Sequence, residues 1–482
     1  MKKTYIVAII VGIVTVIMVG HLILAQNTQQ QEIQQNVLSG KGGETKTTMN
    51  PEGFKPEPIK GPDGRRGWRL RLPESRPLAT PAYAEGMIFV GGGFGSYEFY
   101  ALDAVTGKVK WQFHTGDDGP TAAVVKDGYV AFNTESCILY VLKTKTGELV
   151  WSKWLGDPLM SQPAISGGKL FMAYPASDGK HYLACFNLKD GTEYWKVPIE
   201  GELITAPIID ENSVYITTLE GTVYRFKDSD GKLLWSEKKD ATSSPMIYKG
   251  QIYLSRRETK KVGEKVEQYE GMAQVDRDKG KQVNEELWLK QRADYLNVDR
   301  DSKYAAAQQA HDSSVGFASA PSSAKIYQAE TNLGVVSVSG VWAYQGSRPM
   351  IYNGISYQAM GENLQSMDAK TGKKRWEQKL ARKDKEGGGR LLTPPSLTRG
   401  KLFIGSSEGQ ILCYRQKDGK LLWTYESHEP IRFQPAIAKG RIFFTTDSGT
   451  IYSLETGDSK DDGWYMWGGN EGHNGLSTEN AQ

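Results

Sequence analysis

The sequence predicts an all-β protein, an eight-bladed β-propeller built of four-stranded antiparallel blades. One phrase, read as strand, tight turn, strand and tryptophan, returns eight times along the 482 residues. Where nothing is inserted the period is about 40 residues, which is the length of a propeller blade. The composition includes 53 glycines, 24 tyrosines and 12 tryptophans, a profile that suits many short strands joined by tight turns.

The repeated phrase is represented by "DAVTGKVKW", which ends at Trp111. Its aspartate can accept backbone N–H bonds across the turn, and its glycine supplies the positive φ that a tight hairpin needs. The tryptophan then stands at a fixed place in each blade, where it can wedge neighbouring blades together. We assign this structural docking role to Trp68, Trp111, Trp151, Trp195, Trp235, Trp288, Trp376 and Trp423.

Each copy is preceded by a proline, an apolar pair, a turn and a β-rich run, as in "PAYAEGMIFVGG". These features predict the two inner strands of a blade. The prolines are Pro81, Pro120, Pro163, Pro207, Pro245, Pro349, Pro395 and Pro435.

The eighth copy, "SLETGDSKDDGW", is shortened, so the last blade needs a strand from elsewhere. Trp68 stands 13 residues before Pro81, close to the spacing of 12 between Trp151 and Pro163. We therefore expect the strand around Trp68 to complete the last blade, and Trp464 is the rival candidate.

The pattern A-x-D-x-x-T-G-x-x-x-W, met here as "ALDAVTGKVKW", resembles the tryptophan-docking motif of the pyrroloquinoline quinone (PQQ) repeat family. The resemblance covers roughly residues 65 to 475 and implies an eight-bladed propeller. The family includes PQQ-dependent dehydrogenases and the non-catalytic BamB-type outer-membrane assembly factor. Because one fold carries both enzymes and scaffolds, the resemblance alone does not decide the function.

The N-terminus reads as an export segment. Lys2 and Lys3 precede an apolar run from Tyr5 to Ala25, so residues 1–25 are either a cleaved signal peptide or a retained inner-membrane anchor. Residues 26–60 are rich in Gln, Lys, Gly and Pro and predict a disordered linker. Residues 61–482 then form the propeller, with an insertion at about 289–348. The expected location is the periplasm or cell envelope.

The segments that enter each inner strand should share one face of the ring, the funnel mouth. Four of these segments are neighbours in a closed ring and carry an arginine sector: Arg76, Arg348, Arg390 and Arg432. The other segments carry an acidic sector of Asp117, Asp118, Asp157, Glu200, Glu202 and Asp240. Arginine forks suit an acidic partner segment or a small anion, while the plainer alternative is pairing with nearby carboxylates. The end of the insertion adds Trp342, Tyr344 and Gln345 as candidate binding residues.

Several classes of chemistry lack their residue patterns. The charge balance of +3 gives no argument for nucleic acid, and the six histidines stand singly, outside any metal-binding or hydrolase motif. Members of the dehydrogenase branch hold the quinone against a vicinal cysteine disulfide and use Ca²⁺, but Cys137, Cys185 and Cys413 are far apart in sequence. We therefore predict no catalytic residues, no metal and no cofactor.

The sequence leads to one functional interpretation and one alternative. The interpretation is an exported, non-catalytic scaffold that binds other envelope proteins. The alternative is a PQQ-dependent oxidoreductase with a divergent site, in which case PQQ and Ca²⁺ would be its cofactors.

Overall fold

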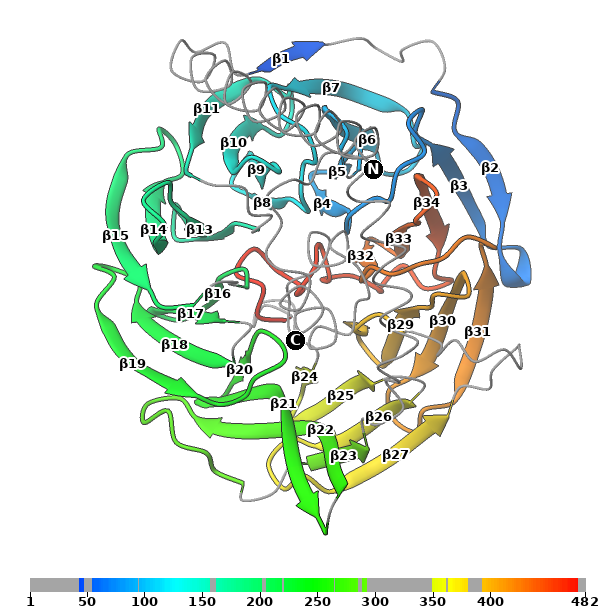
Figure 1. Cartoon of the computed structure of the whole chain (residues 1–482). Coiled ribbons are helices and arrows are strands. Elements are labelled where there is room, and N and C mark those ends of the chain that lie inside the picture. Colours follow the sequence, from blue (N-terminus) through cyan, green and yellow to red (C-terminus); the bar gives the residue numbers. More distant parts are fainter. Residues whose placement is uncertain are drawn as a thin grey trace, which may run out of the picture.

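The computed structural model describes residues 43–46, 54–93, 95–156, 162–201, 205–218, 221–263, 265–284, 288–292, 349–360, 363–379 and 392–475. These residues form eight antiparallel sheets arranged around one axis, as Figure 1 shows. The all-β, eight-bladed fold that the repeats predict is confirmed. Six sheets have four strands each, and the sheets of blades 1 and 8 have five.

Each blade runs from an inner strand at the axis to an outer strand at the rim. Blade 1 contains β4 (Ala82–Ala84), β5 (Met87–Gly91), β6 (Glu98–Asp103) and β7 (Val109–Thr115). Blade 2 contains β8 (Val124–Lys126), β9 (Tyr129–Asn133), β10 (Ile138–Lys143) and β11 (Leu149–Trp154). Blade 3 contains β12 (Ala164–Ser166), β13 (Lys169–Pro175), β14 (His181–Asn187) and β15 (Glu193–Ile199). Blade 4 contains β16 (Ile208–Asp210), β17 (Ser213–Thr217), β18 (Thr222–Lys227) and β19 (Leu233–Lys238).

The remaining blades follow the same order. Blade 5 contains β20 (Met246–Tyr248), β21 (Gln251–Val262), β22 (Lys265–Asp276) and β23 (Trp288–Arg292). Blade 6 contains β24 (Pro349–Tyr352), β25 (Ile355–Met360), β26 (Asn363–Asp368) and β27 (Lys374–Lys379). Blade 7 contains β28 (Ser396–Thr398), β29 (Lys401–Gly405), β30 (Gln410–Arg415) and β31 (Leu421–Glu426). Blade 8 contains β32 (Ala436–Ala438), β33 (Arg441–Thr445) and β34 (Thr450–Glu455), together with β3 (Arg66–Arg71) and β2 (Glu57–Lys60). The 3-10 turn η1 (Pro62–Gly64) joins β2 to β3.

Blade 8 closes the ring with strands from both ends of the chain. β3 pairs with β34 in antiparallel register, with Trp68 opposite Ser453. Trp464 instead forms an isolated bridge with Ile437 in the inner strand β32. Trp68 is therefore the tryptophan that completes the last blade, while Trp464 belongs to a segment at the axis.

Two short strands lie within residues 26–60, the predicted linker. β1 (Gly43–Lys46) pairs with β7, and β2 pairs with β3. Phe54 is buried against the core beside Tyr100, with ring centroids 5.5 Å apart. The outer edges of blades 1 and 8 offer free backbone groups, so even a polar segment can form strand there. The linker prediction therefore does not hold for these strands.

The predicted apolar helix at residues 5–25 and the insertion residues 293–348 lie outside the described residues. Within the described part of the chain, no helix is both long and apolar enough to cross a membrane.

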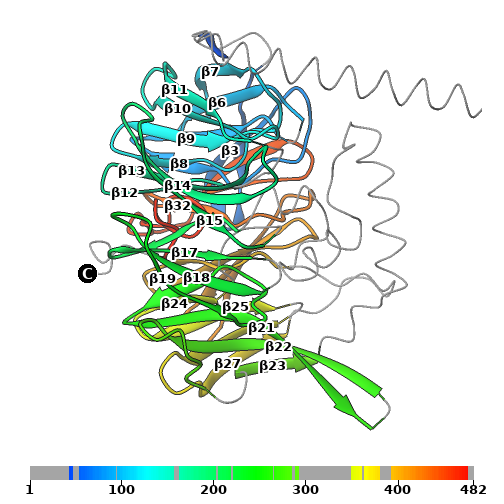
Figure 2. The same ribbon diagram turned by 60° about the vertical axis from the view of Figure 1, so that its left-hand side comes forward.

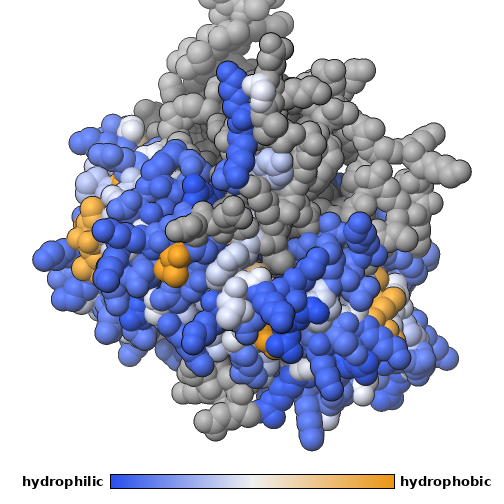
Figure 3. Space-filling model, turned by 90° about the horizontal axis from the view of Figure 1, so that it is seen from below, coloured by the Kyte–Doolittle hydropathy of each residue, from blue (hydrophilic) through white to orange (hydrophobic). Residues whose placement is uncertain are grey.

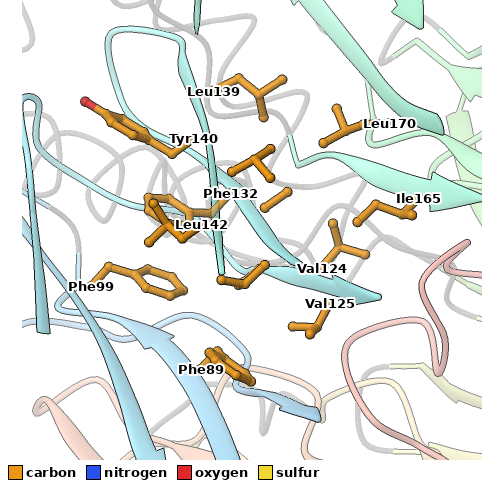
Figure 4. Packing of buried hydrophobic residues seen from close by; sticks show 14 of the residues in the cluster. Phe89, Phe99, Val124, Val125, Phe132, Leu139, Tyr140, Leu142, Ile165 and Leu170 are labelled. Carbon is orange, nitrogen blue, oxygen red and sulfur yellow. The ribbon is translucent and has the colours of Figure 1, made fainter. Parts of the chain in front are cut away.

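The hydrophobic core is divided among the interfaces between neighbouring blades. One cluster joins blades 1, 2 and 3, and Figure 4 shows Phe89, Phe99, Phe132 and Leu170 converging on it from three sheets. Phe99 and Phe132 stack face to face across blades 1 and 2, with centroids 4.0 Å apart. Inner strands such as β5 and β10 are thus buried on both faces, which is why their sequences are apolar on successive residues, whereas outer strands such as β19 are largely exposed.

Blade 5 departs from the others by a long hairpin. β21 and β22 each have 12 residues and remain paired to the turn at Gly263. Figure 2 shows this hairpin projecting beyond the ring. The alternating charges of the segment "RRETKKVGEKVEQYEG" suit a solvated ribbon.

Candidate functional site

The docking tryptophans occupy equivalent positions between blades. Six of the eight assigned indoles donate Nε1–H to a backbone carbonyl at the first turn residue after the third strand of the next blade, over 2.8 to 3.1 Å. Trp111, for example, is 1% exposed and donates to Thr144 over 2.8 Å. The turn glycine Gly147 has φ of 70°, and a Cβ there would lie 2.6 Å from the Trp111 ring. The glycine of the phrase therefore makes room for the preceding blade's indole as well as permitting the turn.

The seam between blades 7 and 8 is built differently. There Arg65 lies over the Trp423 ring, with Cζ 5.1 Å from the ring centroid. The Arg65 Nε–H donates to the Thr456 carbonyl over 3.1 Å, which is the carbonyl position that an indole occupies at the other seams. Because the eighth phrase is shortened, a guanidinium from the segment before β3 takes over part of the contact.

Two residues of the predicted arginine sector lie in the described chain. Arg76 pairs with Glu74 over 2.7 Å, and Arg432 forms an ion pair with Asp447. Both arginines lie beside the turn between β33 and β34. Leu72 and Leu78, on either side of Arg76, donate N–H bonds to that turn at Gly449 and Thr446, and Asp447, the partner of Arg432, belongs to the turn. Arg348, Arg390, Trp342, Tyr344, Gln345, Asp157 and Glu202 lie outside the described residues.

The acidic side of the funnel mouth contains a cluster of three carboxyl groups between blades 1 and 2. Burial raises the pKa of Asp117, whose carboxylate accepts the Ser136 N–H over 2.7 Å. Burial, with Asp117 adding to it, raises the pKa of Asp118 to about 6. Burial, with Asp118 adding to it, raises the pKa of Glu135 to about 8. Charges this close in a partly dry site oppose one another, so Glu135 holds its proton near neutral pH.

Glu135 is the residue of this cluster that the sequence analysis missed. It lies in the turn between β9 and β10, and its Oε1 accepts the Gly95 N–H over 2.9 Å. In a propeller, turns between the second and third strands share the face of the segments that enter the inner strands. The signal was available in the repeat, because the blade 8 turn carries Asp447 at the corresponding place.

The C-terminal segment, residues 464–475, crosses the axis of the ring and is drawn in red in Figure 1. We call it the strap. It accepts one N–H bond from the middle residue of the inner strand in five blades, over 2.6 to 2.8 Å. These donors are Tyr83, Ile165, Ile209, Ile247 and Ile437.

His473 and Trp467 lie in the centre of the strap. Their rings stack with centroids 3.4 Å apart, and both side chains are buried. Burial lowers the pKa of His473 to about 4. The strap residues therefore have a structural role that the tryptophan spacing alone did not reveal.

The outer strands at the rim carry exposed apolar side chains at the two repeat positions just before the docking tryptophan. Eight large apolar side chains are exposed among the described residues, and three of them, Tyr194, Leu233 and Leu234, begin the outer strands of neighbouring blades 3 and 4. Leu421 and Leu422 occupy the same phrase, "DGKLLW", in blade 7. Figure 3 shows one side of the molecule, which is largely hydrophilic with a few separate hydrophobic patches.

The described residues do not fit the quinone site that the dehydrogenase branch implies. Cys137, Cys185 and Cys413 are buried free thiols in three different blades, so they form no vicinal pair. Within the described ranges no group of three acidic, histidine or cysteine residues is placed to hold a metal ion.

The eight sheets and their tryptophan seams define a PQQ-repeat propeller. A family model described as outer membrane protein assembly factor BamB matches residues 58–158, 138–294 and 361–474. This is more than half of the chain, and the chain belongs to that family.

Individual relatives include both assembly factors and enzymes. The tetrathionate hydrolase of Acidithiobacillus ferrooxidans is 24% identical over 450 residues, which cover 83% of this chain and 82% of that protein. The assembly factor BamB of Moranella endobia is 20% identical over 407 residues, covering 78% and 84%. The crystal structure of BamB from Moraxella catarrhalis superposes with a TM-score of 0.52 at 12% identity, over 83% of this chain and all of that one. At that identity the structural likeness shows the fold alone.

Proposed function

We propose that this protein is a non-catalytic scaffold of the cell envelope that binds a partner protein along the rim of blades 3 and 4. The family match supports the role in envelope assembly, and the exposed apolar rim supports the site. The single observation that carries the proposal is the exposure of Tyr194 at 53%, Leu233 at 47% and Leu234 at 42% on adjacent outer strands.

The outer edges of β15 and β19 are suited to an extended partner segment. β7 and β3 have their outer edges covered by β1 and β2 of the same chain, whereas β15 and β19 end their sheets within the described residues. An open strand edge beside apolar side chains can accept an added strand, with the backbone supplying affinity and the side chains specificity. The expected partner therefore presents an extended apolar segment.

The predicted arginine sector is a weaker candidate for the docking site. Arg76 and Arg432 each already hold a carboxylate, so an acidic partner would have to displace Glu74 or Asp447. We propose that the apolar N-terminal run directs export to the envelope. The N-terminal residue of the mature protein would distinguish cleavage of this run from its retention as an anchor.

A photocrosslinking amino acid placed at Leu234 tests the rim. We expect one crosslinked product of defined mass in cells, identified by mass spectrometry as an envelope assembly protein. The matched control is Leu422, which stands in the same phrase on blade 7 with similar exposure. Equal crosslinking at both positions, or none at Leu234, contradicts the proposal.

A second candidate function is catalysis at the funnel mouth. The carboxyl cluster of Asp117, Asp118 and Glu135 favours it, because carboxyl groups with raised pKa values are suited to general acid–base chemistry. The match to a tetrathionate hydrolase over most of both chains supports the same direction. Turnover of tetrathionate, or dye reduction with added PQQ and Ca²⁺, that is lost in Glu135→Gln would place this function above the scaffold.

A further inference from the structure

A hollow of about 810 Å³ lies where the strap meets the inner turns of blades 8, 1 and 2. Its walls include Tyr83, Val125, Tyr465 and Met466, and the turn residues of the three blades form its border. It is separate from the blade 3 and 4 rim and from the carboxyl cluster.

Two tyrosine rings give the hollow an aromatic wall. Tyr83 and Tyr465 have centroids 5.8 Å apart and planes inclined at 31°, and Tyr83 is further supported by Phe443 at 5.9 Å. The Tyr83 N–H also donates to the Tyr465 carbonyl over 2.6 Å, which ties the strap to blade 1. The aromatic faces are therefore held in place before any ligand arrives, and aromatic faces attract cations.

The charges of the border leave an excess of carboxylate. Lys126 pairs with Glu471 over 2.8 Å, and Lys439 pairs with Asp462 over 2.7 Å, so both lysines are already compensated. Two further acids, Glu85 and Asp127, line the same hollow. Neither forms an ion pair with a lysine or arginine of the described chain, although Glu85 accepts a hydrogen bond from Thr144.

Glu85 and Asp127 are placed by the repeat itself. They occupy the same turn position in blades 1 and 2, before Gly86 and Gly128, with φ of 51° and 53°. Tight turns of this kind fix the backbone between two strands. The two carboxylates therefore border the hollow on rigid supports.

We propose that this hollow binds the ammonium or guanidinium group of a lysine or arginine on an extended basic peptide segment of another protein. The tyrosine rings contact the side-chain stem and the cation, while Glu85 and Asp127 supply the opposing charge. The site goes beyond the proposed rim docking and faces a partner of different chemistry.

Fluorescence anisotropy with a labelled Gly-Gly-Arg-Gly-Gly peptide and the full chain tests this proposal. The matched ligand is the same peptide with citrulline, which keeps the shape of arginine without its charge. We expect the arginine peptide to bind at least about fivefold more tightly, and its affinity to fall with added salt.

The double variant Glu85→Gln, Asp127→Asn should weaken arginine-peptide binding about fivefold and leave the citrulline peptide unaffected. Glu148→Gln, an exposed acid in another turn of blade 2, is the control and should bind as the parent does. Tyr465→Leu should weaken both peptides, with its fold checked by circular dichroism. Equal binding of the two peptides, no binding of either, or unchanged affinity in the double variant overturns the proposal.

Discussion

Blade 2 and blade 8 use the same repeat positions with different residues. Blade 2 receives Trp111, which is buried and hydrogen-bonded to the Thr144 carbonyl, whereas blade 8 receives Trp423, which is covered by Arg65. At the funnel mouth, Glu135 of blade 2 faces Asp118, but its counterpart Asp447 of blade 8 faces Arg432.

The difference shows what the repeat conserves within one chain. The three inner strands and the two turns that join them have the same lengths in both blades, while the side chains at the seam and the mouth vary. A blade that is complete in itself uses its own turn to dock an indole. The blade assembled from both chain ends needs a residue from outside the phrase.

The largest effect is expected for Trp111→Ala. The indole is 1% exposed and fills a seam between two sheets, so its removal leaves a cavity and an unpaired Thr144 carbonyl. We expect a loss of about 3–5 kcal/mol in the free energy of unfolding, measured with denaturant. Trp423→Ala is the comparison and should lower the free energy of unfolding less, because Trp423 is 8% exposed and Arg65 supplies part of the contact at its seam. A larger loss at Trp423 would reverse the ranking of the two seams.

An intermediate effect is expected for Arg65→Ala. This change removes the cation from the Trp423 face and the donor from the Thr456 and Pro62 carbonyls. We expect a loss of about 1–3 kcal/mol in the free energy of unfolding, together with faster hydrogen exchange in β34. Arg71→Ala, an exposed arginine at the end of β3, should change stability little. If the two variants behave alike, Arg65 does not support the closing seam.

The smallest effect is expected for Glu135→Gln and depends on pH. The folded state raises the pKa of Glu135 above that of an ordinary glutamate, to about 8. The folded protein therefore binds more protons than the unfolded chain in this range, and stability falls as pH rises from about 4.5 to 8.

Glu135→Gln should therefore raise the thermal midpoint at pH 8 and leave it unchanged at pH 4. The expected gain is on the order of 1 kcal/mol, because the neighbouring residues can relax around a charged Glu135. Asp447→Asn is the contrasting variant and should give a smaller gain at pH 8, since burial raises the pKa of Asp447 but Arg432 opposes that rise. An equal gain from both variants would remove the distinction between the blade 2 and blade 8 turns.

The blades could be predicted from the sequence because the phrase fixes local chemistry. Asp103 accepts the N–H groups of Val105 and Thr106, and Gly107 turns the chain with φ of 72°, so spacing alone locates a hairpin and its tryptophan. The closing role of Trp68 followed from the same spacing.

The remaining features depend on contacts between residues that are distant in sequence. Arg65 meets Thr456 across 391 positions, and nothing in "GRRGWRL" distinguishes it from Arg66. Glu135 acquires its raised pKa from burial and, in addition, from Asp118, neither of which a single turn sequence shows. The apolar rim could not be located from the phrase alone, because the position of Leu233 is buried in blade 1, as Val109, and exposed in blade 7, as Leu421.

The strap determines when the ring can be completed during synthesis. Five inner strands donate an N–H group to residues 464–474, and blade 8 takes its inner strands from residues after 435. Nearly the whole polypeptide must therefore leave the ribosome before the strap can pair with the inner strands at the axis. A chain that ends before residue 464 leaves those five N–H groups without their partners in the strap. Proteases would then meet a ring whose inner strands are not joined at the axis.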